Sequence, residues 1–372
     1  MGFVVREKNN QFAFFNLLRF IGSVSIAIFL HYHYHFLKML AIAPPYTANE
    51  WFNEEVLYEL YYNSYAFVEM FFILSGILFT YAYKKKIYDG LGFDKFILGR
   101  FVRIYPLVII TSLYMYFANV LLLGTTGSLW SSGSSDLFDF FTDSLFGGKS
   151  VFNVADTLNG TIWYINVLMF CYIIAYAITY FTKKNPSVLV YSFPIILGLA
   201  IQYNIISLPF FNESTARGLI AFFIGVILGE LLKKQETIEK PKKYLLNIIY
   251  LLGLYFVYIS REEDHFNSLT NYAAFGIFPL LILLCSNLEI LNKICSTKFV
   301  KYLGNISFGI YLWNFPIYIT LHLLITHNII HVNVISKKFM LFVLAIHMIV
   351  ATISYYAFEK PVGKRLSKAI NK

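Results

Sequence analysis

The chain has 372 residues, of which 58% are hydrophobic and only 14% are charged, and its mean hydropathy is +0.61. A soluble domain carries roughly 25% charged residues, so this composition excludes an ordinary soluble enzyme. Apolar runs of membrane length recur along the whole chain, and the alternating segments of a transmembrane barrel are absent. The sequence therefore predicts an all-α, polytopic transmembrane helix bundle.

The net charge of +9 does not indicate a nucleic-acid partner. The lysines and arginines form short clusters between apolar runs, which is the pattern of cytoplasmic loops in membrane proteins. The three cysteines show no metal-ligand spacing and are expected to be buried, small apolar side chains. We expect a lipid bilayer as the surroundings, with neither nucleic acid nor metal bound.

The apolar runs predict ten membrane spans with both termini on one side. Of the 30 Lys and Arg residues, 23 fall on the side of the termini, so both ends are predicted to be cytoplasmic. No polar stretch reaches the length of a soluble domain, so residues 1–372 are predicted to form a single membrane domain. The predicted spans are 12–32, 60–83, 104–123, 160–182, 187–206, 215–232, 244–260, 270–287, 303–325 and 338–358.

The first span, in NLLRFIGSVSIAIFLHYHYHF, carries Arg19 and, twelve residues later, His31. An ionisable residue in hydrocarbon costs at least ~2.5–3.5 kcal/mol, so it indicates a functional site. At ~1.5 Å of rise per residue the two side chains stand ~18 Å apart along the helix. The pattern favours a cation for an anionic ligand at the inner end and a general base further out. The simpler alternative is that Arg19 reaches the interface and the histidines lie in the outer headgroup zone.

Four other segments place polar groups in or beside spans. Arg100 and Arg103 in GRFVRIYP share one helix face, which suits a phosphate but also fits ordinary cytoplasmic flanking charge. Glu69 lies within the second span, six residues before Ser75, and needs a partner such as Arg19 or a histidine. Glu359, at the end of the tenth span, either pairs with an inner arginine or is solvated. The ninth span carries a dense group of polar side chains, which form either a pocket wall or polar contacts between helices: Asn305, Ser307, Tyr311, Trp313 and Asn314.

The order in which these motifs follow one another along the chain is shared with a known family. The chain resembles the acyltransferase family 3 membrane proteins. These are integral-membrane O-acyltransferases that modify surface polysaccharides, peptidoglycan and some small molecules. The resemblance covers nearly the whole chain. It rests on Leu18-Arg19 to His31; Glu69, Phe71, Phe72, Ser75 and Gly76; Arg100 to Pro106; Trp163; Ile306 to Trp313; and Glu359 to Pro361.

The resemblance implies about ten transmembrane helices in a bacterial inner membrane, with an acyl-CoA donor taken from the cytoplasm. It implies an acceptor hydroxyl near the outer face. It assigns catalysis to His31, Arg19 and Glu69, and donor binding to Arg100, Arg103 and Tyr105. The expected pocket residues are Ser75, Trp163, Tyr311, Asn314, His33, His35 and Glu359.

Two departures bear on the site. The usual Arg–His offset is eleven residues, and here it is twelve, which on an α-helix moves the pair from ~20° to ~120° apart. Either a π-bulge absorbs the extra residue, or His33 or His35 is the base instead. The Tyr-Leu-Trp motif often continues with His, but here the next residue is Asn314, which cannot act as a base.

The sequence thus predicts a membrane O-acyltransferase, with acetyl-CoA as the expected donor and no metal. The expected acceptor is a surface polysaccharide or its lipid-linked precursor. Succinyl or longer acyl groups, and direct transfer or an acyl-enzyme relay, stay open. Two other functions are weighed against it: a transporter or flippase of lipid-linked sugar, and a relay that passes acyl groups to a separate extracytoplasmic transferase. The lack of an internal repeat disfavours transport.

Overall fold

The computed structural model describes residues 12–42, 63–130, 136–146, 158–184, 187–207, 211–260 and 266–370. All elements in these ranges are helices, which confirms the predicted all-α class. Three are π-helices longer than five residues: η2 (Ser25–Leu37), η6 (Tyr272–Ile277) and η7 (Ser354–Glu359).

The remaining helices follow in chain order. The first half contains α1 (Phe14–Val24), η3 (Ser64–Ala66), α4 (Phe67–Phe79), η4 (Thr80–Lys84), α5 (Lys85–Tyr88), α6 (Phe93–Thr126), α7 (Leu137–Phe146) and α9 (Ile162–Phe181). The second half contains η5 (Leu189–Tyr191), α10 (Ser192–Gln202), α11 (Glu213–Glu236), α12 (Lys240–Ser260), α13 (Phe266–Asn271), α14 (Phe278–Asn287), α15 (Glu289–Cys295), α16 (Lys298–Leu312), α17 (Asn314–Thr326), α18 (Lys337–Ile353) and α19 (Lys360–Ile370).

Helices lie at all ten predicted spans, but not all of them are long enough to cross a bilayer. Among the described residues, eight helices are long and apolar enough to cross a bilayer. A ninth span results if α16 and α17 are counted as one helix bent by 57°. The fifth predicted span, 187–206, forms only the short helix Leu189–Gln202. At ~1.5 Å per residue it is about 21 Å long, less than the ~30 Å hydrocarbon core.

The chain divides into two compact units. The first unit comprises Met1–Leu18, Val68–Arg100 and Val167–Leu303, and the second comprises Arg19–Phe67, Phe101–Asn166 and Gly304–Lys372.

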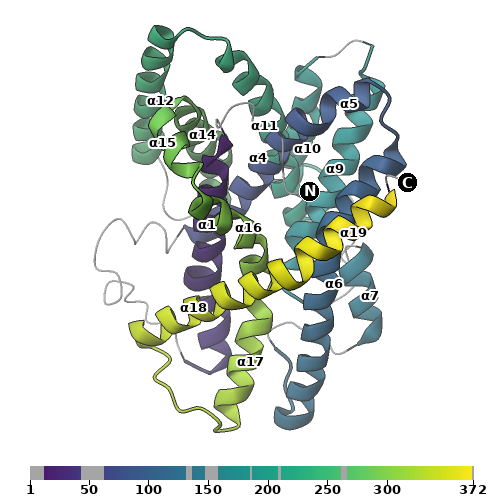
Figure 1. The fold of residues 1–372 in the computed structure, drawn as a ribbon, viewed down its shortest axis with the longest axis vertical. Helices are drawn as coiled ribbons and strands as arrows, with labels where there is room; N and C mark the ends of the chain where they lie inside the picture. The colour runs from purple at the N-terminus through teal and green to yellow at the C-terminus, as the bar shows by residue number, and fades with distance from the viewer. Residues whose placement is uncertain are drawn as a thin grey trace. The chain divides into compact units, whose positions relative to one another are not determined.

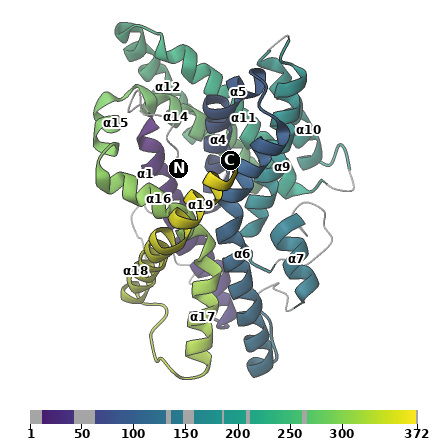
Figure 2. The ribbon, with the colours of Figure 1, turned by 45° about the vertical axis from the view of Figure 1, so that its right-hand side comes forward.

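In the first unit, α4 and α11 lie side by side (Figure 2) and approach each other closely at two glycines, Gly76 and Gly225. A Cβ at Gly76 would collide with the backbone oxygen of Phe222, and one at Gly225 would collide with that of Ile73. Thr80 Oγ1 donates a hydrogen bond of 3.0 Å to the backbone oxygen of Val226. Small residues let helix backbones come close, and this packing replaces the hydrophobic effect that lipid does not supply.

Helix α12 of the same unit is exposed or half-buried along its whole length, whereas α4 and α11 are largely buried. Figure 1 shows it alongside α14, and none of its residues is buried. Its exposed side chains are large and apolar, among them Leu252, Tyr255 and Phe256. In a span of 21 residues this is the surface that lipid covers.

In the second unit, η2 packs against α17, and tyrosine hydroxyls join the two to the rest of the unit. Tyr318 in α17 donates to the backbone oxygen of Ala27 at 2.6 Å. Tyr32 in η2 donates to the backbone oxygen of Val334 at 2.5 Å. Figure 1 shows α18 and α19 following one another in line, joined through η7.

The long segment 124–159, expected to be a loop, contains a helix. Here α6 extends to Thr126, and α7 follows after Asp136, whose carboxylate accepts a 2.9 Å hydrogen bond from the backbone N–H of Phe138. A carboxylate that accepts from the first turn of a helix satisfies one of its unpaired donors. The acidic residues Glu50, Glu54, Glu55, Asp156, Glu262, Glu263 and Asp264 lie outside the described residues.

Candidate active site

The helix that carries Arg19 and His31 changes type between them. It is α-helical to Val24 and π-helical from Ser25 to Leu37. A π-helix closes its hydrogen bonds from i to i+5, so each residue turns through less than the ~100° of an α-helix. Over the residues from Ser25 to His31 this deficit accumulates in the direction that closes the ~120° offset of a regular α-helix. The structure therefore supports the alternative in which π-helical backbone absorbs the extra residue.

His31 is buried, with 8% of its surface exposed, and its ring is held by residues of α17. The side-chain amide nitrogen of Asn314 lies 2.6 Å from Nδ1 of His31. The ring of Phe315 packs on the imidazole with centroids 4.8 Å apart. The contact fixes one ring nitrogen, so Nε2 is the nitrogen available to exchange a proton with a substrate.

The neighbouring histidines differ from His31 in their contacts. Nδ1 of His33 lies 3.1 Å from the backbone oxygen of Phe29 in its own helix, to which only an N–H can donate. His35 is half-buried, and its ring meets that of His31 edge-on at 5.2 Å. The ring of His35 also contacts α17, through Phe315 at a centroid distance of 5.1 Å, whereas Nδ1 of His31 lies within hydrogen-bond distance of a side chain of that helix, Asn314. This geometry favours His31 as the base.

Asn314 owes its position to a break between α16 and α17. The helix bends by 57° at Trp313, and Pro316 follows in the first turn of α17. Proline has no N–H to donate to the carbonyl four residues earlier, which is that of Leu312. Asn159 supplies the missing donor, since its Nδ2 lies 3.4 Å from the backbone oxygen of Leu312. Because the backbone oxygen of Leu312 has a hydrogen-bond donor, the bend between α16 and α17 is stable and holds Asn314 in place.

Two further pocket residues predicted in this region lie near the break. The hydroxyl of Tyr311 donates to the backbone oxygen of Thr161 at 3.1 Å, and the Tyr311 ring packs edge-on against Tyr164. Trp163 is half-buried in the first turn of α9. Tyr311 therefore ties α16 to the start of α9, where Trp163 lies.

Arg103 and Glu359 both belong to the second unit, and their charges interact. Arg103 is exposed, whereas Glu359 is half-buried and accepts a 3.2 Å hydrogen bond from Ser354 Oγ. The contact that the structure gives for the Glu359 carboxylate is the one with Ser354, so pairing with an inner arginine stays a prediction. Tyr105, predicted to contact the donor, is buried and stacks on Phe101 with centroids 4.0 Å apart.

Three predicted site residues belong to the first unit: Glu69, Ser75 and Arg100. Arg100 is buried, with its guanidinium 4.4 Å from the centroid of the Tyr83 ring and hydrogen-bonded to the Tyr83 hydroxyl. It also lies 5.7 Å from the Tyr172 ring. Ser75 is half-buried, next to the close approach at Gly76. Aromatic rings thus hold Arg100, while Arg103 is the exposed member of the pair.

The partner of Glu69 is Arg217, which the sequence reasoning missed. Arg217 Nε lies 2.5 Å from Glu69 Oε1, and Nη2 lies 3.0 Å from Oε2, so the two side chains form a bidentate pair. Both side chains are almost fully buried, at 2% and 10% exposed. Depth along the predicted spans does not point to this pair, because Glu69 lies nine residues inside the start of 60–83 and Arg217 only two residues inside the start of 215–232.

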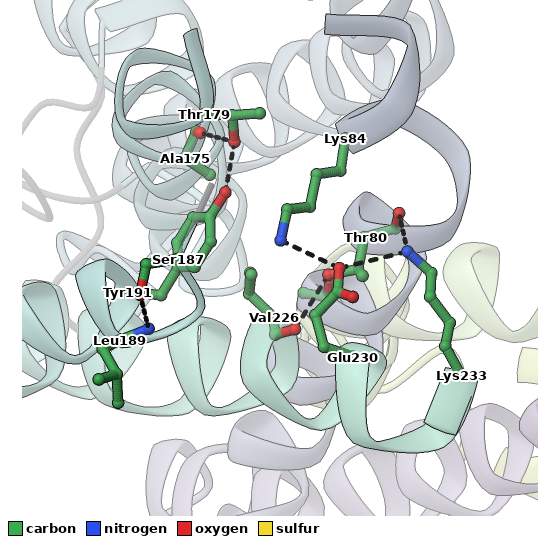
Figure 3. Close-up of polar contacts among 11 residues, drawn as sticks. Thr80, Lys84, Ala175, Thr179, Ser187, Leu189, Tyr191, Val226, Glu230 and Lys233 are labelled. Atoms are coloured by element: carbon green, nitrogen blue, oxygen red, sulfur yellow. Dashed lines mark hydrogen bonds and ion pairs between the residues drawn. The ribbon is translucent and has the colours of Figure 1, made fainter. Parts of the chain in front are cut away.

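A second charge cluster in the first unit also went unpredicted (Figure 3). Lys84 Nζ and Lys233 Nζ lie 3.0 and 3.2 Å from the same oxygen of Glu230. Lys233 also donates to the backbone oxygen of Thr80 at 3.3 Å, and Lys84 lies 5.0 Å from the centroid of the Tyr191 ring. The cluster ties η4 to α11 beyond the glycine contacts.

Comparison with known proteins agrees with the motifs. A family described as an acyltransferase domain matches residues 12–358. A curated relative, protein 2 in the picA locus of Rhizobium radiobacter, is 42% identical over 67 residues. That match covers 17% of this chain and 34% of the relative, so the chain matches about a third of the relative's length. No solved structure shows a significant match. The chain therefore belongs to the acyltransferase family that its motifs resemble, and the part that the structure describes contains at least eight helices long and apolar enough to cross a membrane.

Proposed function

We propose that this protein transfers an acyl group, in the first instance acetyl, from cytoplasmic acyl-CoA to a hydroxyl of a surface polysaccharide or its lipid-linked precursor in a bacterial inner membrane. The observation that carries the proposal is the buried imidazole of His31 with Asn314 on its Nδ1. Acyl transfer to a hydroxyl requires a positioned base, and a histidine held at one nitrogen is the usual one.

In this reaction Nε2 of His31 takes the proton of the acceptor hydroxyl as its oxygen attacks the thioester carbonyl carbon. The carbon–sulfur bond then breaks, and the CoA thiolate leaves and takes the proton from His31. Burial of His31 excludes water, which would otherwise compete with the acceptor hydroxyl for the acyl group.

The phosphates of the donor need cations at the cytoplasmic end. Arg103 fits this role best because its guanidinium is exposed and a guanidinium binds phosphate bidentately. Arg19 and Arg100 stay in the proposal as further donor contacts. The cluster of charged residues on the cytoplasmic side, predicted from the distribution of Lys and Arg, supports entry of an anionic donor from that side.

The test is turnover by the purified protein in lipid nanodiscs, with acetyl-CoA and lipid-linked or polymeric glycans bearing free hydroxyls. Release of CoA thiol that depends on the glycan, with acetyl appearing on it, is the expected result. No thioester turnover with acetyl-, succinyl- or longer acyl-CoA, together with glycan movement across vesicles, would favour transport instead. Thioester turnover without glycan acylation until a second transferase is added would favour the relay.

A further inference from the structure

The side chain of Asn314 has two polar ends, and only one has a partner. Its nitrogen lies 2.6 Å from His31 Nδ1, whereas its oxygen is fully buried and forms no hydrogen bond with any residue that the structure describes. A buried amide atom without a partner is costly, and such atoms mark places where another group is expected. The substrate must reach His31 to react, so a group of the substrate is the expected partner for this end of the Asn314 amide.

The chemistry of His31 determines which end of the amide faces it. The two orientations of an asparagine amide exchange nitrogen and oxygen at nearly the same positions. If nitrogen faces Nδ1, then Nδ1 carries the lone pair, neutral His31 is protonated on Nε2, and it cannot accept a proton there. If oxygen faces Nδ1, it accepts the Nδ1–H bond, and Nε2 carries the lone pair that a base needs. A working base therefore places the Asn314 oxygen on His31 and turns the NH₂ group to the buried position that has no partner among the described residues.

We propose, on the basis of the acyl-transfer function above, that Asn314 is a catalytic residue with two roles. Its carboxamide oxygen holds Nδ1–H of His31, and its NH₂ group donates a hydrogen bond to the thioester oxygen of the acyl donor. Both ends of the amide are then satisfied in the complex with substrate.

The second role acts on charge that develops during the reaction. When the acceptor oxygen attacks, the carbonyl π pair moves onto the thioester oxygen, which becomes an oxyanion, while the hydroxyl proton goes to Nε2 of His31. The NH₂ group of Asn314 donates to that oxyanion. The pair then returns to re-form the carbonyl, the carbon–sulfur bond breaks, and the thiolate takes the proton from His31. Side-chain amides serve as oxyanion donors in this way, and they act more strongly in a site without water.

The backbone around Asn314 supports a fixed geometry for this donor. Asn314 begins α17 directly after the bend, and Asn159 holds the carbonyl of Leu312. Phe315 contacts both His31 and the backbone at Gly160, where a Cβ would lie 2.9 Å from the Phe315 ring. A donor fixed before the reaction needs no reorganisation when charge develops.

Three variants of the purified full-length protein test the proposal, with kcat and KM for acetyl-CoA measured at a saturating glycan concentration. Asn314→Ala removes both roles and should lower kcat by about 10²–10³-fold while leaving KM nearly unchanged, because the lost bond forms in the transition state. Asn314→Asp keeps an acceptor for Nδ1–H, but it replaces the donor by a carboxylate whose negative charge repels the oxyanion, so its kcat should be no higher than that of Asn314→Ala.

The matched control is Asn292→Ala in the first unit. Asn292 is buried at 5% exposure, its Nδ2 donates to the backbone oxygen of Cys285, and its oxygen is also without a hydrogen-bond partner among the described residues. Its loss should lower the melting temperature in nanodiscs and leave kcat of the folded protein unchanged.

Three results would overturn the proposal. Wild-type kcat in Asn314→Ala, measured per folded molecule, would show that Asn314 is only structural. Wild-type kcat in Asn314→Asp would show that it orients His31 without donating to the oxyanion. The absence of thioester cleavage by the wild-type protein would instead remove the acyl-transfer function, and this proposal with it, so the two failures are distinguishable.

Discussion

The two units treat buried polar groups in different ways. In the first unit the charges are matched: Glu69 has a bidentate partner in Arg217, and Glu230 has two lysines. In the second unit the polar groups sit at irregular backbone, on the π-helix that carries His31 and after the bend that presents Asn314. Irregular backbone and partly unsatisfied side chains also occur in the first unit, at the π-helices η4 and η6 and at Asn292, so what distinguishes the second unit is that such a side chain lies on a buried imidazole. We therefore expect the first unit to serve mainly as a scaffold and the second to carry the chemistry.

The largest expected effect comes from removing the base in the second unit. His31→Gln should lower kcat by about 10²–10⁴-fold, since general-base catalysis contributes a factor of that size. His33→Gln should have a much smaller effect, because that ring is bonded to its own helix. CoA release by the two purified variants measures the difference. A lower rate for His33→Gln than for His31→Gln would move the base to His33.

The next effect concerns stability in the first unit. Glu69→Ala leaves Arg217 buried without its carboxylate and should destabilise the protein by about 3–5 kcal/mol. The double variant Glu69→Met with Arg217→Met removes both charges and should recover most of that loss. Thermal unfolding in nanodiscs compares them with wild type. A double variant that is as unstable as Glu69→Ala would show that the pair is not the main role of these residues. A double variant that is as stable as wild type but has no turnover would show that Glu69 is catalytic, as its place in the sequence motif implies.

Close packing of α4 and α11 provides a third test of the scaffold. Gly225→Ala places a methyl group against the backbone oxygen of Ile73 and should cost about 1–3 kcal/mol, the usual penalty of overpacking. Gly124→Ala in α6 is the control, since a Cβ there meets nothing within 4 Å. The control should be neutral or slightly stabilising, because alanine favours a helix more than glycine does. Equal melting temperatures for the two variants would argue against the close approach.

The smallest expected effect is at Lys233, which shares Glu230 with Lys84. Its side chain is 37% exposed, against 8% for Lys84, so Lys233→Ala should cost about 0–1 kcal/mol. Lys84→Ala should cost more, since it removes the buried member of the cluster. The melting temperatures of the two variants rank them. A larger loss at Lys233 would contradict the burial that distinguishes the two lysines.

Hydropathy predicted where the helices lie, because burial in lipid requires long apolar stretches whatever their partners are. It overestimated the stretch at 187–206, where apolar residues flank the short helix Leu189–Gln202. The twelve-residue offset between Arg19 and His31 left two alternatives open, a π-bulge or a different histidine as the base. Periodicity does not determine how far π-helical backbone extends, and η2 runs from Ser25 to Leu37.

Pairing between helices was harder to predict than the helices themselves. Glu69 was expected to need a partner, yet Arg217 is 148 residues away, and hydropathy gives the depth of a residue without its neighbours. Asn314 was expected in the pocket, but not on His31, 283 residues earlier. That contact depends on the bend at Trp313 and on the missing N–H of Pro316, both of which are local properties with distant consequences.

The most direct test of the account is the O-acetyl content of the cell-surface glycan in cells that lack this gene and are complemented with wild type, His31→Ala or Asn292→Ala. Our account predicts O-acetyl groups with wild type and Asn292→Ala, and their loss in the deletion and with His31→Ala at equal protein levels. Retention of O-acetyl groups with His31→Ala would contradict the claim that a buried imidazole in the second unit performs the transfer.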